Sequence, residues 1–247
     1  MSNETKVIYD GPSLIDGERV IVLAQRGSSN RKTGDMLQTY ILRADADPIT
    51  ASRTGQDYSI CGSCPHRGEA HDGDKGQAKG RTCYVTLAHG PLGKWKAWSR
   101  GMYESIQGHK AIAAFGRGHM VRIGTYGDGA VVPSWVWESL VSEAEGHTAY
   151  SHQSGLVPVD QSMYMISVES KEQATKAWNT GARTFRVVPD VDAVVKGKEI
   201  LCPASEEMGK RATCLTCKLC SGTKTKAKSI AIVAHGTAKR KAKELVA

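Results

Sequence analysis

Long apolar runs are missing from this sequence, and their absence excludes whole classes of protein. No uninterrupted apolar stretch in the 247 residues approaches the roughly 20 that a membrane-spanning helix needs. The N-terminal segment Met-Ser-Asn-Glu-Thr-Lys also lacks the apolar core of a secretory signal. We therefore expect a cytoplasmic protein that has no membrane partner.

Several catalytic and binding motifs are missing too. The sequence has no Walker GxxxxGKS/T motif, no GxSxG elbow and no HExxH pair. It has two phenylalanines, no RGG tract and no RNP-like aromatic strand, so the common RNA-binding signatures are absent as well. A metal-dependent nuclease or hydrolase is therefore the least favoured of our hypotheses.

Cysteine, in contrast, is abundant and clustered. The seven cysteines form a first thiol set and a second thiol set, which are Cys61, Cys64 and Cys83, then Cys202, Cys214, Cys217 and Cys220. In a reducing cytoplasm such CxxC spacings indicate metal binding more than disulfides, and an odd number cannot pair completely. Short loops let neighbouring thiolates converge on one inorganic centre. The sequence therefore predicts two metal sites.

The second thiol set is the stronger signal. Its CxxCxxC run resembles the central cysteine run of bacterial ferredoxins, and Cys202-Pro203 supplies a fourth thiolate. Zinc usually takes two separated CxxC knuckles, so a 4Fe-4S cluster is favoured, while zinc and a metal-free set remain alternatives. On the first thiol set a 4Fe-4S cluster would keep one iron open for a substrate or S-adenosylmethionine. On zinc, His66 or His71 would complete a tetrahedron.

Strand-like and helix-like segments alternate along most of the chain, which predicts a parallel sheet. Strands are expected at 18–27, 37–44, 81–89, 119–125, 147–151, 163–168, 182–188, 199–202 and 229–234. Helices are expected at 91–106, 133–145, 170–180 and from about 237, the third with a capping box at Ser170 and Gln173. We expect a single α/β domain over 1–247, a partial or irregular (β/α) TIM-like barrel. It would carry metal-binding loops at about 59–83 and 202–222 and a basic C-terminal helix at about 237–247.

Polar side chains follow the expected strands at the point where each strand ends. In parallel α/β folds these ends meet on one rim, and that rim holds the active site. Each residue alone could cap a strand or satisfy a buried carbonyl, but their convergence favours one pocket. The candidate catalytic residues are Asp128, His152, Glu169, Arg186 and His235. Arg186 is expected to hold an anionic group such as a phosphate.

Positive charge is in excess, with a formal net charge of +8. Much of that excess lies between Lys224 and Lys243, near the C-terminus. A basic face of this kind suits nucleic acid or another polyanion, and it is also what a solvated surface helix looks like.

The early cysteines and the glycine-containing segment Ile-Gly-Thr-Tyr-Gly-Asp at 123–128 together resemble a divergent radical S-adenosylmethionine enzyme. The cysteine gaps here are two and eighteen residues, whereas the usual motif of that family is compact. The resemblance implies a partial (β/α) barrel, an iron–sulfur cluster on the first thiol set, and S-adenosylmethionine as a cofactor. The cofactor-binding residues that it implies are Tyr126, Gly127 and Asp128.

A broader likeness covers residues 59–236. The series Cys-Gly-x-Cys-Pro-His-Arg, Thr-Cys-Tyr-Val, Arg-Ile-Gly-x-Tyr-Gly-Asp and Cys-Pro-Ala-Ser-Glu-Glu is similar to a family of uncharacterised bacteriophage-encoded proteins. This resemblance implies a viral setting in the host cytoplasm, with nucleic acid or a nucleotide as substrate.

Two hypotheses follow. The first is an iron–sulfur redox or radical enzyme that acts on a nucleotide or nucleic acid at the rim, where Asp128, His152 and Glu169 position the substrate or move protons. The alternative is a zinc-stabilised nucleic-acid-binding protein of phage replication or DNA modification, whose basic C-terminal helix grips phosphates.

Overall fold

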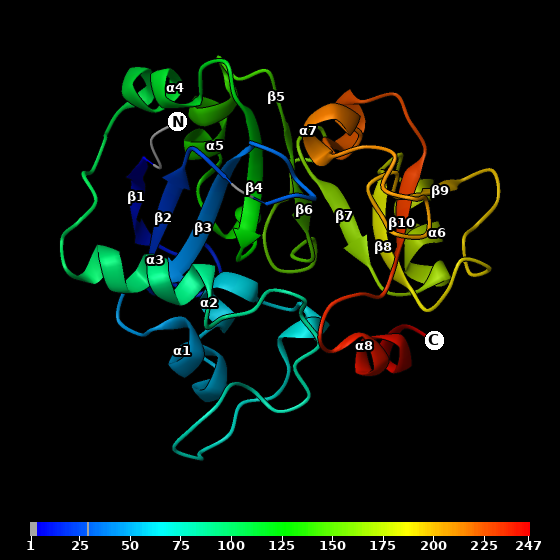
Figure 1. The fold of residues 1–247 in the computed structure, drawn as a ribbon, viewed down its shortest axis with the longest axis horizontal. Helices are drawn as coiled ribbons and strands as arrows, with labels where there is room; N and C mark the ends of the chain where they lie inside the picture. Colours follow the sequence, from blue (N-terminus) through cyan, green and yellow to red (C-terminus); the bar gives the residue numbers. More distant parts are fainter. Residues whose placement is uncertain (1–3, 29) are drawn as a thin grey trace.

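The computed structural model describes residues 4–28 and 30–247, and these form a mixed α/β fold. Their ten strands make two five-stranded sheets that lie side by side, the first blue to green and the second yellow-green to orange-red in Figure 1. Residues 1–3, part of the segment considered for a secretory signal, lie outside the described residues. None of the described helices is long and apolar enough to cross a membrane.

The first sheet joins antiparallel strands to parallel ones. Its order is β1-β2-β3-β4-β5, antiparallel from β1 to β3 and parallel from β3 to β5. These strands are β1 (Thr5–Pro12), β2 (Arg19–Gln25), β3 (Leu37–Arg43), β4 (Met120–Tyr126) and β5 (Gly146–Thr148). The apolar run 20–24 in β2 is completely buried, as expected for a strand that is covered on both faces.

The second sheet is entirely parallel, with the order β6-β7-β8-β10-β9. Its strands are β6 (Tyr150–Ser151), β7 (Met165–Val168), β8 (Thr184–Val188), β9 (Glu199–Leu201) and β10 (Ser229–Val233). The chain passes from β5 to β6 through Ala149 alone. The Ala149 carbonyl accepts a 3.0 Å hydrogen bond from the Met165 amide, so the two sheets meet at this residue.

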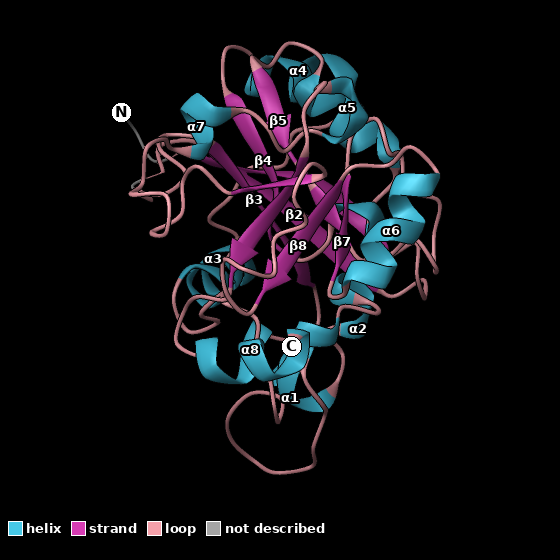
Figure 2. Ribbon diagram, turned by 90° about the vertical axis from the view of Figure 1, so that its right-hand side faces the viewer, coloured by secondary structure: helices cyan, strands magenta, loops and turns pink. Residues whose placement is uncertain are grey.

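Helices and short turns connect the strands. They are α1 (Pro48–Thr54), α2 (Tyr58–Cys61), η1 (Pro65–Arg67), α3 (Gly90–Ser99), α4 (His109–Gly116), η2 (Gly129–Val131), α5 (Ser134–Val141), α6 (Lys171–Asn179), α7 (Cys214–Cys217), η3 (Gly222–Lys224) and α8 (Lys239–Val246). The predicted capping box of α6 is confirmed, because Ser170 and Gln173 satisfy each other's backbone amides. This helix packs against β7 and β8 (Figure 2).

The largest core cluster lies around the first sheet and fixes the loop that follows β4. Trp137 of α5 is fully buried, and its indole Nε1 donates a 2.8 Å hydrogen bond to the Gly129 carbonyl. Helices α4 and α5 also pack closely, since a Cβ built on Gly116 would lie 1.9 Å from the Leu140 carbonyl oxygen. The segment containing Asp128 is therefore held by a rigid core.

Several expectations need correction. The segment 81–89 is not a strand. The amides of Thr82 and Cys83 both donate to the His66 carbonyl, which anchors this segment to the η1 turn instead of to a sheet. The helix expected over 91–106 ends at Ser99, and the strand β1 and helices α1 and α4 were not predicted. Among the described residues the strands form two sheets and no closed barrel, and the expected partial or irregular barrel stays a prediction.

Candidate metal and substrate site

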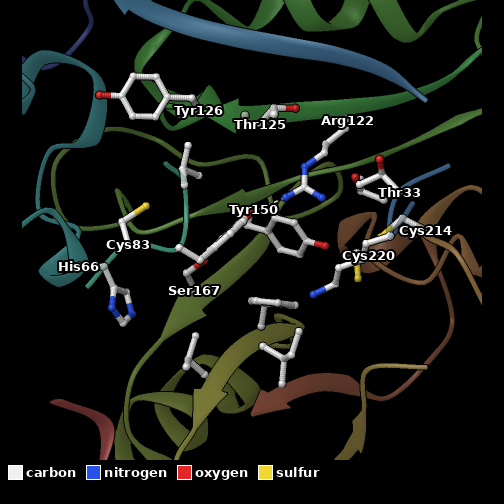
Figure 3. A pocket seen from close by; sticks show the side chains of 18 of the residues that line it. Thr33, His66, Cys83, Arg122, Thr125, Tyr126, Tyr150, Ser167, Cys214 and Cys220 are labelled. Carbon is white, nitrogen blue, oxygen red and sulfur yellow. Dashed lines mark hydrogen bonds between the residues drawn. The ribbon is translucent and has the colours of Figure 1, made fainter. Parts of the chain in front are cut away.

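A cavity of about 480 Å³ lies over strands of both sheets, and all seven cysteines line it. The first thiol set occupies one end and the second thiol set the other. Figure 3 shows Cys83 with His66 on one side and Cys214 with Cys220 on the other, while Arg122 and Tyr150 lie between them. Cysteines remote in sequence thus face one shared space.

The loop that carries Cys61 and Cys64 is held by a buried glutamine. The Gln153 side chain is fully buried, and its Nε2 donates to the Cys61 carbonyl at 2.9 Å. Its Oε1 accepts a 3.1 Å bond from the Ser63 amide. Gly62 has φ +47°, and a Cβ there would lie 2.0 Å from Gln153 Oε1. Only glycine therefore lets the CxxC turn approach its support so closely.

The second thiol set is held by a loop from the other sheet. The Cys214 and Leu215 amides donate 3.0 Å hydrogen bonds to the carbonyls of Lys32 and Thr33, just before β3. A capping box between Thr213 and Thr216 begins α7. Lys218 then adopts a left-handed conformation that ends this helix, which turns the chain toward Cys220.

Burial controls the protonation of the thiols. It raises the pKa of Cys61, Cys83, Cys202 and Cys217 above the ordinary value, and it raises the pKa of Cys220 to about 12. These groups are therefore neutral at pH 7 unless a cation stabilises the thiolate. A bound metal would supply that cation and release the protons.

The spacing of the sulfurs bears on which metal fits. Within the described ranges, no three of the thiols have their sulfur atoms all within 4.8 Å of one another. Four sulfurs on a single zinc ion would stand about 3.8 Å apart, given bonds of about 2.3 Å. Closing a thiol set on one zinc ion would thus require the side chains or their loops to move. An iron–sulfur cluster binds each thiolate through a different iron and accepts wider spacing.

Two cationic side chains face the second thiol set from the first sheet. Arg122 on β4 is nine-tenths buried, donates to the Tyr84 hydroxyl, and lies within electrostatic reach of Cys214 and Cys220. Its Nε has no hydrogen-bond partner among the described residues. Lys32 Nζ lies 3.2 Å from Nε2 of His235. These charges can offset thiolates, a cluster, or an anionic ligand.

Burial and these neighbours also affect the titration of the lysine and the histidine. Burial lowers the pKa of Lys32, while a negative charge on the nearby Cys202 would oppose that shift. Burial and the positive Lys32 both lower the pKa of His235. His235 is therefore neutral at pH 7 and accepts a hydrogen bond from the ammonium group. Its ring stacks on Tyr84 at 5.3 Å between centroids, which gives this part of the pocket a flat aromatic wall.

The other end of the pocket holds a histidine–carboxylate pair. His152 follows β6 and Glu169 follows β7, and His152 Nε2 lies 2.8 Å from Glu169 Oε1. Burial disfavours the charged imidazole, but interactions with Cys64 and Glu169 outweigh it and hold the pKa of His152 well above its usual value. His66 lies beside this pair, with its Nε2 3.8 Å from the same carboxylate oxygen.

The structure brings together four of the five residues predicted at strand ends. Asp128, His152, Glu169 and His235 line the pocket, whereas Arg186 does not. Arg186 forms a buried two-bond ion pair with Glu199 at 2.9 and 2.7 Å. Its guanidinium is thus committed to a carboxylate outside the pocket, and the expected role in holding a substrate anion has no support in its position.

The three residues expected to contact S-adenosylmethionine also line the pocket. The Asp128 carboxylate accepts hydrogen bonds from the amides of Ala130 and His152 and from Gln153 Nε2. Gly127 has φ +80°, and a Cβ there would lie 2.8 Å from Cβ of Ile41. Asp128 and Gly127 therefore shape the loop itself, and their contact with a cofactor stays a prediction.

Scans of protein-family models, of curated proteins and of solved structures gave no match to this chain. Sequence reasoning missed Lys32, Arg122, Tyr150 and Gln153. An arginine in the middle of the apolar strand Met-Val-Arg-Ile was a signal for Arg122, but no local pattern marks the other three.

Proposed function

We propose that this chain is an iron–sulfur enzyme whose redox or radical chemistry acts on an anionic substrate, a nucleotide or nucleic acid, within the pocket between the two thiol sets. The observation that carries the proposal is that all seven cysteines line a single cavity. Metal sites that only stabilise loops have no need to share a cavity with each other. As part of this proposal, the two sheets together correspond to an incomplete (β/α) barrel with the pocket at its rim.

The residues present fit such clusters. The second thiol set offers four sulfurs, which close the coordination of a 4Fe-4S cluster, and the first offers three, which leave one iron open. Lys32 and Arg122 supply positive charge beside the second set. A bound cluster supplies one-electron chemistry. We assign a supporting role to the cluster on the second thiol set. The cluster on the first thiol set is assigned the role of facing the substrate.

The chain's own residues would bind and orient the substrate. The unpartnered Nε of Arg122 points to an anionic group such as a phosphate, and Arg122 lies between the two thiol sets. The Tyr84–His235 stack provides a flat surface for a base. Tyr150 and Phe185, whose ring centroids lie 4.3 Å apart, add apolar wall to the pocket. A nucleotide combines these two kinds of chemistry, a planar base and a charged phosphate.

Metal and sulfide analysis of protein expressed and purified without oxygen in iron-replete medium tests the proposal. We expect iron, acid-labile sulfide, a brown colour, and an electron paramagnetic resonance signal after reduction. Cys64→Ser should remove the signal of one cluster, and Cys217→Ser that of the other. Ser63→Ala, in the same loop, is the matched control and should keep both. Colourless protein with stoichiometric zinc would overturn the proposal.

S-adenosylmethionine as a cofactor is a separate part of this proposal. The carboxylate of Asp128 already accepts three hydrogen bonds from protein groups, so we do not build the substrate site on it. Calorimetric titration of the iron-loaded protein with S-adenosylmethionine decides the question, because saturable binding at a 1:1 ratio supports the cofactor and absence of heat rejects it.

The alternative, a zinc-stabilised nucleic-acid-binding protein, is favoured by one observation. Helix α8 exposes four basic side chains while its Ala242 lines the pocket, so positive charge lies at the pocket edge; these side chains are Lys239, Arg240, Lys241 and Lys243. Replacing all four by glutamine should weaken DNA or RNA binding and flatten its salt dependence. Replacing Lys171 and Lys176 of α6 by glutamine is the control. Unchanged binding in the α8 variant rejects this alternative.

A further inference from the structure

A second kind of metal site lies at the first end of the pocket, beside the thiols but made of nitrogen and oxygen donors. The ligand atoms of His66, His152 and Glu169 all lie within 4.8 Å of one another, and no other such group of histidine, cysteine or acidic residues occurs in the part of the chain that the structure describes. We propose that these three residues bind one divalent transition-metal ion, separate from any cluster on the thiols.

The first argument is the buried imidazole of His66. Its Nδ1 lies 2.8 Å from the Thr82 hydroxyl, while its Nε2 is buried and has no hydrogen-bond partner among the described residues. The residue as a whole is 8% exposed. A buried ring nitrogen without a partner carries a desolvation cost. Metal-binding histidines commonly have this arrangement, with one nitrogen fixed by a neighbour and the other free for the ion.

The second argument is the geometry of the donors. Glu169 Oε1 lies 2.8 Å from His152 Nε2 and 3.8 Å from His66 Nε2. Donors on one tetrahedral zinc ion stand about 3.3 Å apart, because the bonds are about 2.0–2.1 Å long. The observed separations lie on either side of that value, so small side-chain rotations would seat an ion. Two histidines and one carboxylate suit ferrous iron or zinc and leave coordination positions open.

The third argument is where the ligands come from. His66 lies in η1, directly after the Cys61–Cys64 turn, and His152 and Glu169 follow two adjacent parallel strands, β6 and β7. The Glu169 amide is fixed by Gln173 Oε1 at 2.8 Å, within the cap of α6. All three ligands line the shared pocket. An ion held here would face the same space as the thiols, with its open positions available to a substrate oxygen or a water molecule.

Cobalt titration separates this site from the thiol sets, because thiolate–cobalt charge transfer absorbs strongly in the near ultraviolet and histidine–carboxylate coordination does not. The probe is cobalt(II) chloride alone, added without oxygen to the 247-residue chain as purified. Bound cobalt and zinc are counted by native mass spectrometry. We expect His66→Gln and Glu169→Gln each to bind one ion fewer than the parent protein, with the thiolate charge-transfer band unchanged.

His71→Gln is the matched control, because His71 is a half-buried histidine in the same region and bonds to the Gln77 carbonyl instead of facing the pocket. It should keep the full number of ions. Thr82→Val replaces the hydroxyl beside His66 with a methyl group. It should weaken binding of the ion at the His66, His152 and Glu169 site by roughly 10–100-fold. Circular dichroism of each variant establishes whether it is folded. If His66→Gln does not fold, the ion count of Glu169→Gln tests the site.

Three results would overturn the inference. One is an unchanged ion count in both folded variants. Another is loss of the ion together with the thiolate band, which would make His66 a ligand of the first thiol set instead. The third is an equal loss in His71→Gln. The proposal does not depend on the iron–sulfur assignment, since absence of iron and sulfide leaves all of these readouts intact.

Discussion

Breaking the buried ion pair between Arg186 and Glu199 tests whether Arg186 stabilises the fold or binds the substrate. Arg186 was expected at the active rim, but in the structure it forms this pair instead. The Arg186 and Glu199 side chains are 4% and 0% exposed. Glu199 Oε2 also accepts a 2.8 Å bond from the Val195 amide, and Arg186 donates a 2.7 Å bond to the Ala193 carbonyl. The pair thus ties β8 to the loop before β9.

Removing one partner leaves the other charge buried and uncompensated, which costs about 3–5 kcal/mol. That is a large fraction of a typical unfolding free energy of about 5–15 kcal/mol. With a urea m-value of about 3 kcal/mol/M, Arg186→Met or Glu199→Leu should lower the unfolding midpoint by roughly 1–2 M. The double variant should lose far less stability than the two single losses added together, because two apolar side chains replace a desolvated ion pair.

Tryptophan fluorescence in urea measures these midpoints, with all four proteins at the same metal content. Metal content and nucleotide binding of the folded Arg186→Met protein are measured beside them and should match the parent, because Arg186 lies outside the pocket. Additive losses in the double variant would refute the ion-pair argument. Loss of nucleotide binding without loss of stability would return Arg186 to the substrate site.

Three further perturbations test other parts of the structure. Gly116→Ala should destabilise the protein by more than about 1 kcal/mol, because its Cβ would collide with the Leu140 carbonyl; Gly93→Ala, in open space on α3, should be neutral or stabilising by up to about 1 kcal/mol. Burial lowers the pKa of His147, so its contribution to stability should be lost as pH falls below about 6.5. His147→Gln should flatten that acid limb of the unfolding midpoint, and an unchanged limb contradicts the assignment. Gln153→Leu should weaken metal binding at the first thiol set by roughly 10–100-fold while leaving the second intact, as metal analysis after dialysis would reveal.

Local sequence patterns predicted most strands because their apolar runs are buried. The capping box of α6 was also predictable from local sequence, since its two hydrogen bonds join residues three positions apart. The segment around Cys83 was not, because its backbone bonds go to His66, seventeen residues earlier. A pairing of that range leaves no periodic signal, and the apolar residues of this segment were mistaken for a strand.

Arg186 illustrates a different limit. Side chains alternate along a strand, so Phe185 and Val187 of β8 face the pocket while Arg186 faces the other side. The sequence identifies the strand and its polar member but not which face meets the cavity. By the same alternation Arg122 of β4 does line the pocket. The arginine that lines the pocket is therefore Arg122, whereas the predicted anion-binding residue, Arg186, faces the other side of its sheet.

The anchoring of the two thiol sets links metal binding to the shape of the pocket. The first set lies in a loop that follows β3 of the first sheet, and it is fixed by Gln153 from the second. The second set lies in a loop that follows β9 of the second sheet, and it is fixed by the carbonyls of Lys32 and Thr33 from the first. Each thiol set therefore bridges the two sheets on which the pocket is built. Because metal ligands need their thiols deprotonated and close together, loading either set, as proposed above, would tighten a contact between sheets. The substrate-binding surface is thus expected to be complete only when the metal sites are filled.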